Sequence, residues 1–158
     1  MGGRVGWVLK FVVCGGYDFL VEVLPVIDLN PRVLAACLND FSQKCLLTAV
    51  GAAASRRHYE VSIEHLLFVL LDDDQSDVPT LLRHYEIAPQ PFKQQVEGAL
   101  SDFRSGNTGQ AVFSPLLLNW IRDAWLLASL THGLAKVRSG VLLEALITKP
   151  SSYTAHTF

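Results

Sequence analysis

An internal repeat limits the folds that this chain can adopt. Ser62-Ile-Glu-His-Leu-Leu aligns with Arg138-Ser-Gly-Val-Leu-Leu at a shift of 76 positions. Each copy follows an alanine-rich helical stretch, at 49–55 and at 124–129. Repeats of this kind indicate supersecondary units that bury their hydrophobic faces against one another. The sequence therefore predicts a tandem pair of small helical units, which is typical of a binding module rather than an enzyme.

Composition narrows the class of protein. The chain has 158 residues, half of them apolar and 18% charged, enough for one domain or one domain with an appendage. The mean hydropathy of +0.29 predicts a well-buried helical core or an apolar surface kept for a partner. With a net charge of -2 and no basic stripe, nucleic-acid binding is not expected.

Neither the cysteines nor the N-terminus indicates export. Cys14, Cys37 and Cys45 contain no C-x-x-C spacing, so we interpret them as reduced thiols of a cytoplasmic protein. The apolar run at 5–13 is interrupted by Lys10 and is too short to span a membrane. We expect no membrane association.

The chain divides into three parts. Residues 1–27 are rich in glycine and β-branched residues and form an extension that does not continue the helical pattern. Residues 28–153 carry the helical repeats, and 154–158 form a tail. The extension could be a hairpin, a disordered arm or sequence from an upstream start codon.

Helix starts are signalled by capping residues. Asn30-Pro31 and Ser114-Pro115 place a side-chain acceptor before a proline at the first helical position. After Asn30 the apolar spacing continues to Ala53, which predicts one long helix or two joined near residues 40–42.

Further helices are predicted over 62–71, 80–85, 92–103 and 140–147. Ser62 is expected to cap the first of these, Ser76 or Asp77 the second, and Ser139 the last. Leu81, Leu82 and Tyr85 are expected to face inwards. Pro89 and Pro91 are expected to break the chain.

No motif for catalysis or metal binding is present. The sequence lacks a phosphate-binding G-x-x-x-x-G-K-[ST] loop, H-E-x-x-H and G-x-S-x-G. We interpret His65 as a satisfied, partly buried residue. Glu60 and Glu64 flank a capping serine, where the helix N-terminus favours negative charge without any catalytic role. No cofactor and no metal are expected.

Large apolar residues crowd the helix that starts at Pro115. Trp120 and Trp125, together with Leu116, Leu117 and Ile121, cover more than half of its surface. We expect most of them in the core and some against a partner, because aromatic residues dominate interface energetics.

These residues carry a family resemblance. Tyr59-Glu-Val-Ser-Ile-Glu-His-Leu-Leu and Leu81-Leu82-Arg83 resemble the Clp N-terminal domain of Clp/Hsp100 unfoldases. The run from Phe113-Ser-Pro to Trp125-Leu-Leu-Ala-Ser-Leu, then Arg138-Ser-Gly-Val-Leu-Leu, is similar to the N-domain of ClpV, the AAA+ ATPase of bacterial type VI secretion. The resemblance covers about residues 29–153 and implies an all-α bundle of about 7–8 helices.

The resemblance also implies a partner. Domains of this family bind the N-terminal helix of the large sheath subunit, which contraction exposes, and the AAA+ rings then dismantle the sheath. The helix lies in an apolar groove that involves the first helix, which here implies Leu34, Leu38 and Phe41, with Leu82 and Tyr85 completing the groove. The isolated domain is expected to be a monomer, because hexamer contacts come from the ATPase rings. With no AAA+ module after Phe158, it is expected to recognise the sheath without remodelling it.

Three alternatives remain open at this stage. The chain could be the substrate- or adaptor-binding N-domain of a general Clp disaggregase or protease chaperone. It could be a truncated, non-functional remnant. A small hydrolase or metal enzyme is disfavoured by the missing motifs.

Overall fold

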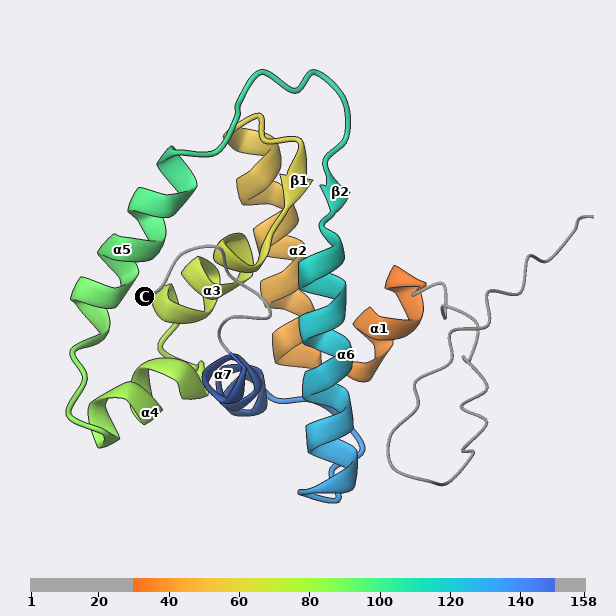
Figure 1. Ribbon diagram of the computed structural model, residues 1–158, viewed down its shortest axis with the longest axis vertical. Coiled ribbons are helices and arrows are strands. Elements are labelled where there is room, and N and C mark those ends of the chain that lie inside the picture. Colours follow the sequence, from red (N-terminus) through yellow and green to blue (C-terminus); the bar gives the residue numbers. More distant parts are fainter. Residues whose placement is uncertain (1–29, 150–158) are drawn as a thin grey trace, which may run out of the picture.

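A computed structural model of the protein describes residues 30–149, in which seven α-helices and two short strands are found (Figure 1). The elements are α1 (Pro31–Cys37), α2 (Asp40–Ser55), β1 (Glu60–Val61), α3 (Ile63–Asp72), α4 (Asp77–His84), α5 (Pro89–Ser101), β2 (Val112–Phe113), α6 (Pro115–Leu130) and α7 (Ser139–Thr148). The predicted all-α class with two repeated helical units is confirmed. The predicted extension at 1–27 and tail at 154–158 lie outside the described residues.

The first predicted helical stretch is two helices. Asn30 caps α1 as expected, its Oδ1 accepting a hydrogen bond from the Arg32 N–H at 3.0 Å. The chain then becomes extended at Leu38 and Asn39. Asn39 starts α2 through a hydrogen bond from the Ser42 N–H to its Oδ1 at 2.9 Å. The break therefore lies slightly before the predicted joint and has its own cap.

One helix begins at a predicted cap and another begins earlier than the sequence predicted. Ser76, one of the two predicted caps, accepts a hydrogen bond from the Val78 N–H at 3.2 Å, so α4 begins at Asp77. The helix α5 begins at Pro89, three residues before its predicted start. Pro89 and Pro91 lie in its first turn, where backbone N–H groups have no intrahelical acceptor and proline is tolerated.

The two repeats have the same construction. In each, a helix of 16 residues (α2 or α6) is followed by an extended segment and a helix of 10 residues (α3 or α7). The helices α4 and α5 follow the first unit and precede β2. Within each unit the long and short helices pack together, and α3 also packs on α5 (Figure 1).

Short extended segments join the two units reciprocally. Val61 of the first unit pairs in parallel with Phe113, which precedes α6 in the second. Val137 of the second unit pairs in parallel with Leu38, which precedes α2 in the first. At the first bridge, the backbone N–H of the residue after Phe113 donates to the Val61 carbonyl at 3.0 Å. At the second bridge, the backbone N–H of the residue after Leu38 donates to the Val137 carbonyl at 2.9 Å. Each unit therefore completes the backbone hydrogen bonds of the other.

The core lies between α2, α3, α6 and α7. Trp120 is fully buried, and its indole N–H donates to the Leu142 carbonyl at 2.9 Å, which ties α6 to α7. A buried indole needs such a partner. Leu117 and Ile121 are also buried, whereas Leu116 is exposed. The crowded apolar helix is therefore mostly core, as predicted.

Asp77 is the first residue of α4 and connects this helix to the start of α7. Its Oδ2 accepts hydrogen bonds from the Ser139 hydroxyl at 3.0 Å and from the Gly140 N–H at 3.2 Å. Its Oδ1 accepts from the Arg138 guanidinium at 3.1 Å, and its own N–H donates to Ser139 Oγ at 2.9 Å. The prediction that Ser139 caps α7 is wrong: Ser139 is the first residue inside the helix, and Asp77 of α4 accepts the hydrogen bond from the Gly140 N–H. Partial burial raises the pKa of Asp77, but the hydrogen bonds from Arg138, Ser139 and Gly140 outweigh burial and lower the pKa.

Replacing Asp77 should weaken the junction between the units. We expect Asp77→Ala to lower the free energy of unfolding by about 1–3 kcal/mol, because it removes several charge-assisted hydrogen bonds. Urea unfolding at pH 7 measures this. Asp40→Ala is the matched control, since Asp40 holds the same first position in α2 but is exposed. The control should cost about 0.3–1 kcal/mol, the contribution of a carboxylate near a helix N-terminus. Equal losses in the two variants would contradict this role.

Candidate functional site

The five residues predicted to bind a peptide fall into two groups. Leu34 lies on α1, with Leu38 and Phe41 at the α1–α2 corner, whereas Leu82 and Tyr85 lie on and just after α4. The helix α1 contacts α6, and α4 contacts α7. In Figure 1, α6 and α7 lie between α1 and α4. The structure therefore does not bring all five residues together, and two separate surfaces have to be considered.

In the first group, two of the three residues are buried. Leu34 is 7% exposed, and Leu38 is fully buried in its pairing with Val137. Phe41 is half-buried against the core. The large apolar side chain that α1 exposes to solvent is Val33, at 61% exposure, which was not among the predicted site residues. Val33 precedes Leu34, and only the packed structure shows which of the two neighbours faces outwards.

Next to α1, the helix α6 contributes Trp125. One flank of α6 faces α7, where Asp123, Leu126 and Leu127 line a shallow hollow. At 100° per residue, Leu118 and Trp125 lie on the opposite flank of α6, and α6 also contacts α1. Trp125 is 37% exposed. We call the surface formed by Val33, Phe41, Leu118 and Trp125 the first-helix face.

The second group lies in an apolar groove between α4 and α7. This α4–α7 groove has a volume of about 700 Å³. Leu82 is buried in its floor, but Tyr85 is 70% exposed on its rim, so the prediction that Tyr85 faces the core is wrong. Tyr85 is the C-cap residue of α4, and Glu86 after it has a positive φ of 59°, which turns the chain away. The apolar residues that line the groove are Leu81, Leu82, Tyr85, Ile87, Leu134, Val141, Leu143 and Ile147.

Charged residues of the α4–α7 groove are paired with one another. Arg138 bonds Asp77, and His132 lies 2.8 Å from the Glu144 carboxylate. Because these groups already have partners, the apolar side chains are the part of the groove that remains available to a ligand. A surface of this kind can take the apolar side of an amphipathic helix or an extended apolar segment.

A pair of buried histidines supports the start of α3. His58 Nδ1 lies 2.9 Å from His65 Nε2, and His65 is fully buried. The Ser62 N–H donates to His65 Nδ1 at 3.1 Å, which makes Nε2 the protonated nitrogen and His58 Nδ1 its acceptor. The His65 ring thus takes the place that Glu or Gln fills in a capping box. The interpretation of His65 as a satisfied residue is confirmed.

Both histidines are held neutral. Burial lowers the pKa of His65 to about 4, with further lowering by His58 and Arg56. Burial and the charge of Arg56 lower the pKa of His58 as well. Burial, followed by the charge of Asp73, raises the pKa of the Cys45 thiol to about 11, so this thiol is inert at neutral pH.

Residues 30–149 lack two further features. No three His, Cys, Asp or Glu side chains in this range are grouped so that they could hold a metal ion. None of its helices has the length and apolar character needed to cross a bilayer.

Comparison with known proteins identifies the family. Residues 38–158 match the Clp repeat (R) N-terminal domain. The N-domain of ClpV from Vibrio cholerae is 34% identical, with 82% of this chain and 76% of that chain covered and a TM-score of 0.74. A complex of a ClpV N-domain with a VipB peptide is 33% identical over 80% of this chain and 77% of that chain, with a TM-score of 0.72. No curated protein matches significantly.

A third solved structure comes from a type VI secretion system. The N-terminal domain of the ClpV1 ATPase from the E. coli EAEC Sci1 type VI system is 28% identical, with 78% of this chain and 75% of that chain covered and a TM-score of 0.73. The chain therefore belongs to the Clp N-terminal repeat domains. Within this family it has the fold of the ClpV N-domains of type VI secretion, as the sequence resemblance implied.

The histidine pair predicts a pH dependence of stability. Because the pKa of His65 is lowered from 6.5 to about 4, the unfolded state binds more protons between these values. The contribution of His65 to the free energy of unfolding is therefore complete above pH 6.5. This contribution is lost as pH falls towards 4, and the total loss is roughly 3 kcal/mol. Urea unfolding at several pH values between 5 and 7 measures the slope.

Two variants test the assignment to His65. His65→Leu should be less stable at pH 7, because it leaves polar partners unsatisfied, but its stability should vary less between pH 5 and 7. His84→Gln, on the exposed side of α4, should retain the slope of the unmodified protein. A slope unchanged in His65→Leu would assign the titration to other groups.

Proposed function

We propose that this domain recognises a short amphipathic helix at the N-terminus of the large sheath subunit of a type VI secretion system. The observation that carries the proposal is a ClpV-type N-domain fold with large apolar side chains left exposed on two helices. A solved ClpV N-domain of the same fold binds a VipB peptide. The bound sheath subunit would then be delivered to a AAA+ unfoldase for sheath disassembly.

The first-helix face is the proposed contact surface. Val33 and Trp125 project from neighbouring helices α1 and α6, and half-buried Phe41 lies at the start of α2. Two helices side by side present the groove into which the apolar side of a third helix fits. Leu34 and Leu38, which the resemblance placed in this groove, lie beneath it and fix its shape.

We propose that the described residues bind a partner and do not catalyse a reaction. The first-helix face carries aliphatic and aromatic side chains and no pair of nucleophile and base. Binding energy here would come from burial of apolar area. We therefore propose that the domain is not itself an enzyme.

The α4–α7 groove supports a second candidate function. It is an apolar concavity that is lined by Leu82 and Tyr85 and lies apart from the first-helix face. Apolar segments of unfolded chains or an adaptor could bind there, which is the role of an N-domain in a general Clp disaggregase or protease chaperone. The two candidates make opposite predictions for variants on the two surfaces.

A peptide titration with surface variants distinguishes them. The probe is a fluorescent peptide that copies the N-terminal helix of the large sheath subunit from the same genome. Val33→Asp should weaken its binding at least about tenfold, which corresponds to 1.4 kcal/mol, because a carboxylate would enter an apolar contact. Tyr85→Asp on the α4–α7 groove should leave binding unchanged. Both positions are exposed, so both variants should fold.

Leu47→Asp is the matched control. Leu47 is an exposed apolar residue on α2, on the flank away from Phe41, and its replacement should not affect binding. Loss of binding in Tyr85→Asp but not in Val33→Asp would move the site to the α4–α7 groove. If the folded, unmodified protein does not bind the peptide, recognition of the sheath helix is wrong.

A further inference from the structure

The segment that precedes α1 is joined directly to the first-helix face. The described residues begin at Asn30, and Val33, the most exposed residue of that face, lies three positions further on. Residues 1–29 lie outside the described part of the chain, but their sequence is known. These residues are therefore tethered at the edge of the surface that is proposed to bind the sheath helix.

Within this segment, residues 17–24 have the spacing of an amphipathic helix. The apolar residues at positions i, i+3, i+4 and i+7 of this run are Tyr17, Leu20, Val21 and Leu24. Side chains with this spacing are the ones that anchor a helix in an apolar groove. Gly15-Gly16 precede the run and Pro25 follows it. The sequence of the segment therefore contains an apolar side of the kind that the first-helix face is proposed to bind.

The first-helix face leaves apolar area for such an occupant. Val33 is 61% exposed, Trp125 is 37% exposed and Phe41 is half-buried. These side chains come from three helices, because α1 contacts both α2 and α6. Burial of apolar area stabilises a contact by about 25 cal/mol per Å². An apolar segment that covers this face would therefore be bound favourably.

The segment at 17–24 is acidic. Its charged residues are Asp18 and Glu22, which lie one helical turn apart and outside the apolar set. No lysine or arginine lies between residues 11 and 31, so no neighbouring cation in the sequence neutralises them. A surface with free positive charge would attract this segment in preference to other apolar surfaces.

The first-helix face has free positive charge at its edges. The charged residues of α1 and α2 are Arg32, Lys44 and Asp40, two positive and one negative. Arg32 precedes Val33, and Lys44 lies one turn after Phe41. Both cations are exposed, and neither pairs with a carboxylate within residues 30–149. The face and the segment are therefore complementary in charge.

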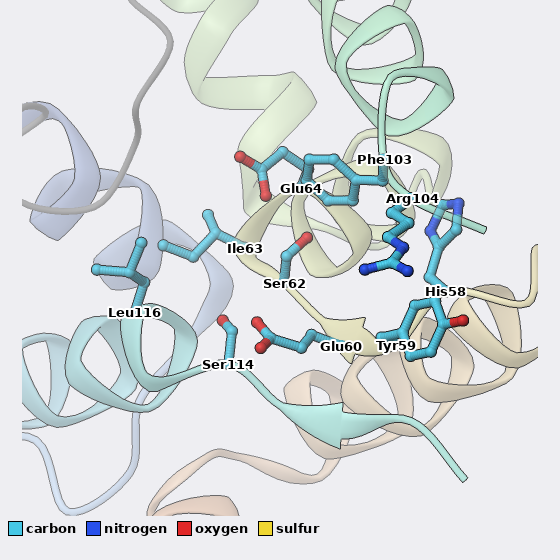
Figure 2. Close-up of a pocket in the computed structure, with 10 residues that line it drawn as sticks. All are labelled: His58, Tyr59, Glu60, Ser62, Ile63, Glu64, Phe103, Arg104, Ser114 and Leu116. Carbon is cyan, nitrogen blue, oxygen red and sulfur yellow. The ribbon is translucent and has the colours of Figure 1, made fainter. Parts of the chain in front are cut away.

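Two hollows elsewhere on the domain match the segment less well. The charged groups of the α4–α7 groove already pair with one another. A second hollow, of about 430 Å³, is shown in Figure 2, and its charged lining residues other than histidine are Glu60, Glu64 and Arg104. Two carboxylates against one guanidinium would repel an acidic segment. Charge therefore favours the first-helix face.

The connection is long enough to bring the segment back onto the face. Residues 25–30 span at most about 20 Å when extended. A helix of eight residues is about 12 Å long, about half the length of the 16-residue α6. A tether this short gives an effective concentration in the millimolar range. Even a contact of low intrinsic affinity would then cover the face for much of the time.

We propose that residues 17–24 bind the first-helix face of their own chain and compete there with the sheath helix. The proposal rests on the proposed function, because this face is the one assigned to sheath recognition. It adds a competitor that belongs to the chain itself. An external helix then binds only the fraction of molecules in which the face is free, and its apparent affinity falls by that fraction.

The contact within the chain is tested first without any peptide. In the ¹H–¹⁵N spectrum of the full chain, the indole N–H signal of Trp125 is identified by its loss in Trp125→Phe. Leu20→Asp should shift this signal, because a carboxylate on the apolar side removes the segment from the face. Phe19→Asp is the matched control and should leave the signal in place, since position 19 falls on the opposite side at 100° per residue. The indole signal of fully buried Trp120 should stay unchanged in both variants.

Binding of the fluorescent sheath peptide gives a second measurement. Leu20→Asp should tighten binding at least about fivefold, the gain expected when a segment that covers the face about four-fifths of the time is removed. Phe19→Asp should change binding less than about twofold. If circular dichroism shows that Leu20→Asp does not fold, Leu24→Asp replaces it with the same expected results.

Three results would overturn the proposal: a Trp125 signal that Leu20→Asp does not move, equal effects of Leu20→Asp and Phe19→Asp, or a measurable peptide affinity that Leu20→Asp leaves unchanged. In each case, binding of the peptide by the unmodified chain would leave sheath recognition standing. A Trp125 shift in Leu20→Asp, with no peptide binding by any variant, would support the contact within the chain and reject sheath recognition. The two failures can therefore be told apart.

Discussion

The reciprocal pairing of extended segments is the constraint on which the rest of the structure depends. Each unit alone is a pair of helices with one apolar side, which cannot be buried without a partner. The bridges of Val61 with Phe113 and of Val137 with Leu38 set the two units in one register. Asp77 adds a polar connection between α4 and α7. The α4–α7 groove is lined by residues from both helices, so its shape follows from this arrangement.

Two surfaces of the domain are apolar. The first-helix face is formed by aliphatic and aromatic side chains, and the ionisable groups in the α4–α7 groove are already paired with one another. Burial of apolar area would therefore contribute most of the binding energy at both surfaces. Charged groups at the edge of such a contact contribute selectivity and rate of association.

The buried histidine pair shows how the fold keeps polar groups inside without charge. His65 combines two roles, since one ring nitrogen accepts from the backbone at the start of α3 and the other donates to His58. A glutamate in the same capping position would place a charge in the core. An imidazole held neutral gives the same hydrogen bond at a smaller cost of desolvation. As a consequence, the free energy of unfolding depends on pH in the mildly acidic range.

The sequence by itself determined the helical class, the two-unit repeat and the caps at Asn30 and Ser114, because periodicity and capping are local properties. The family resemblance was also visible in the sequence alone, because short motifs carry it. Tertiary structure alone decided that Leu38 is buried while Val33 is exposed, and that Ser139 bonds Asp77 and not its own helix. Helical spacing shows which residues share a face but not what that face packs against. The division of the five predicted residues between two surfaces therefore required the position of α6 and α7 between α1 and α4.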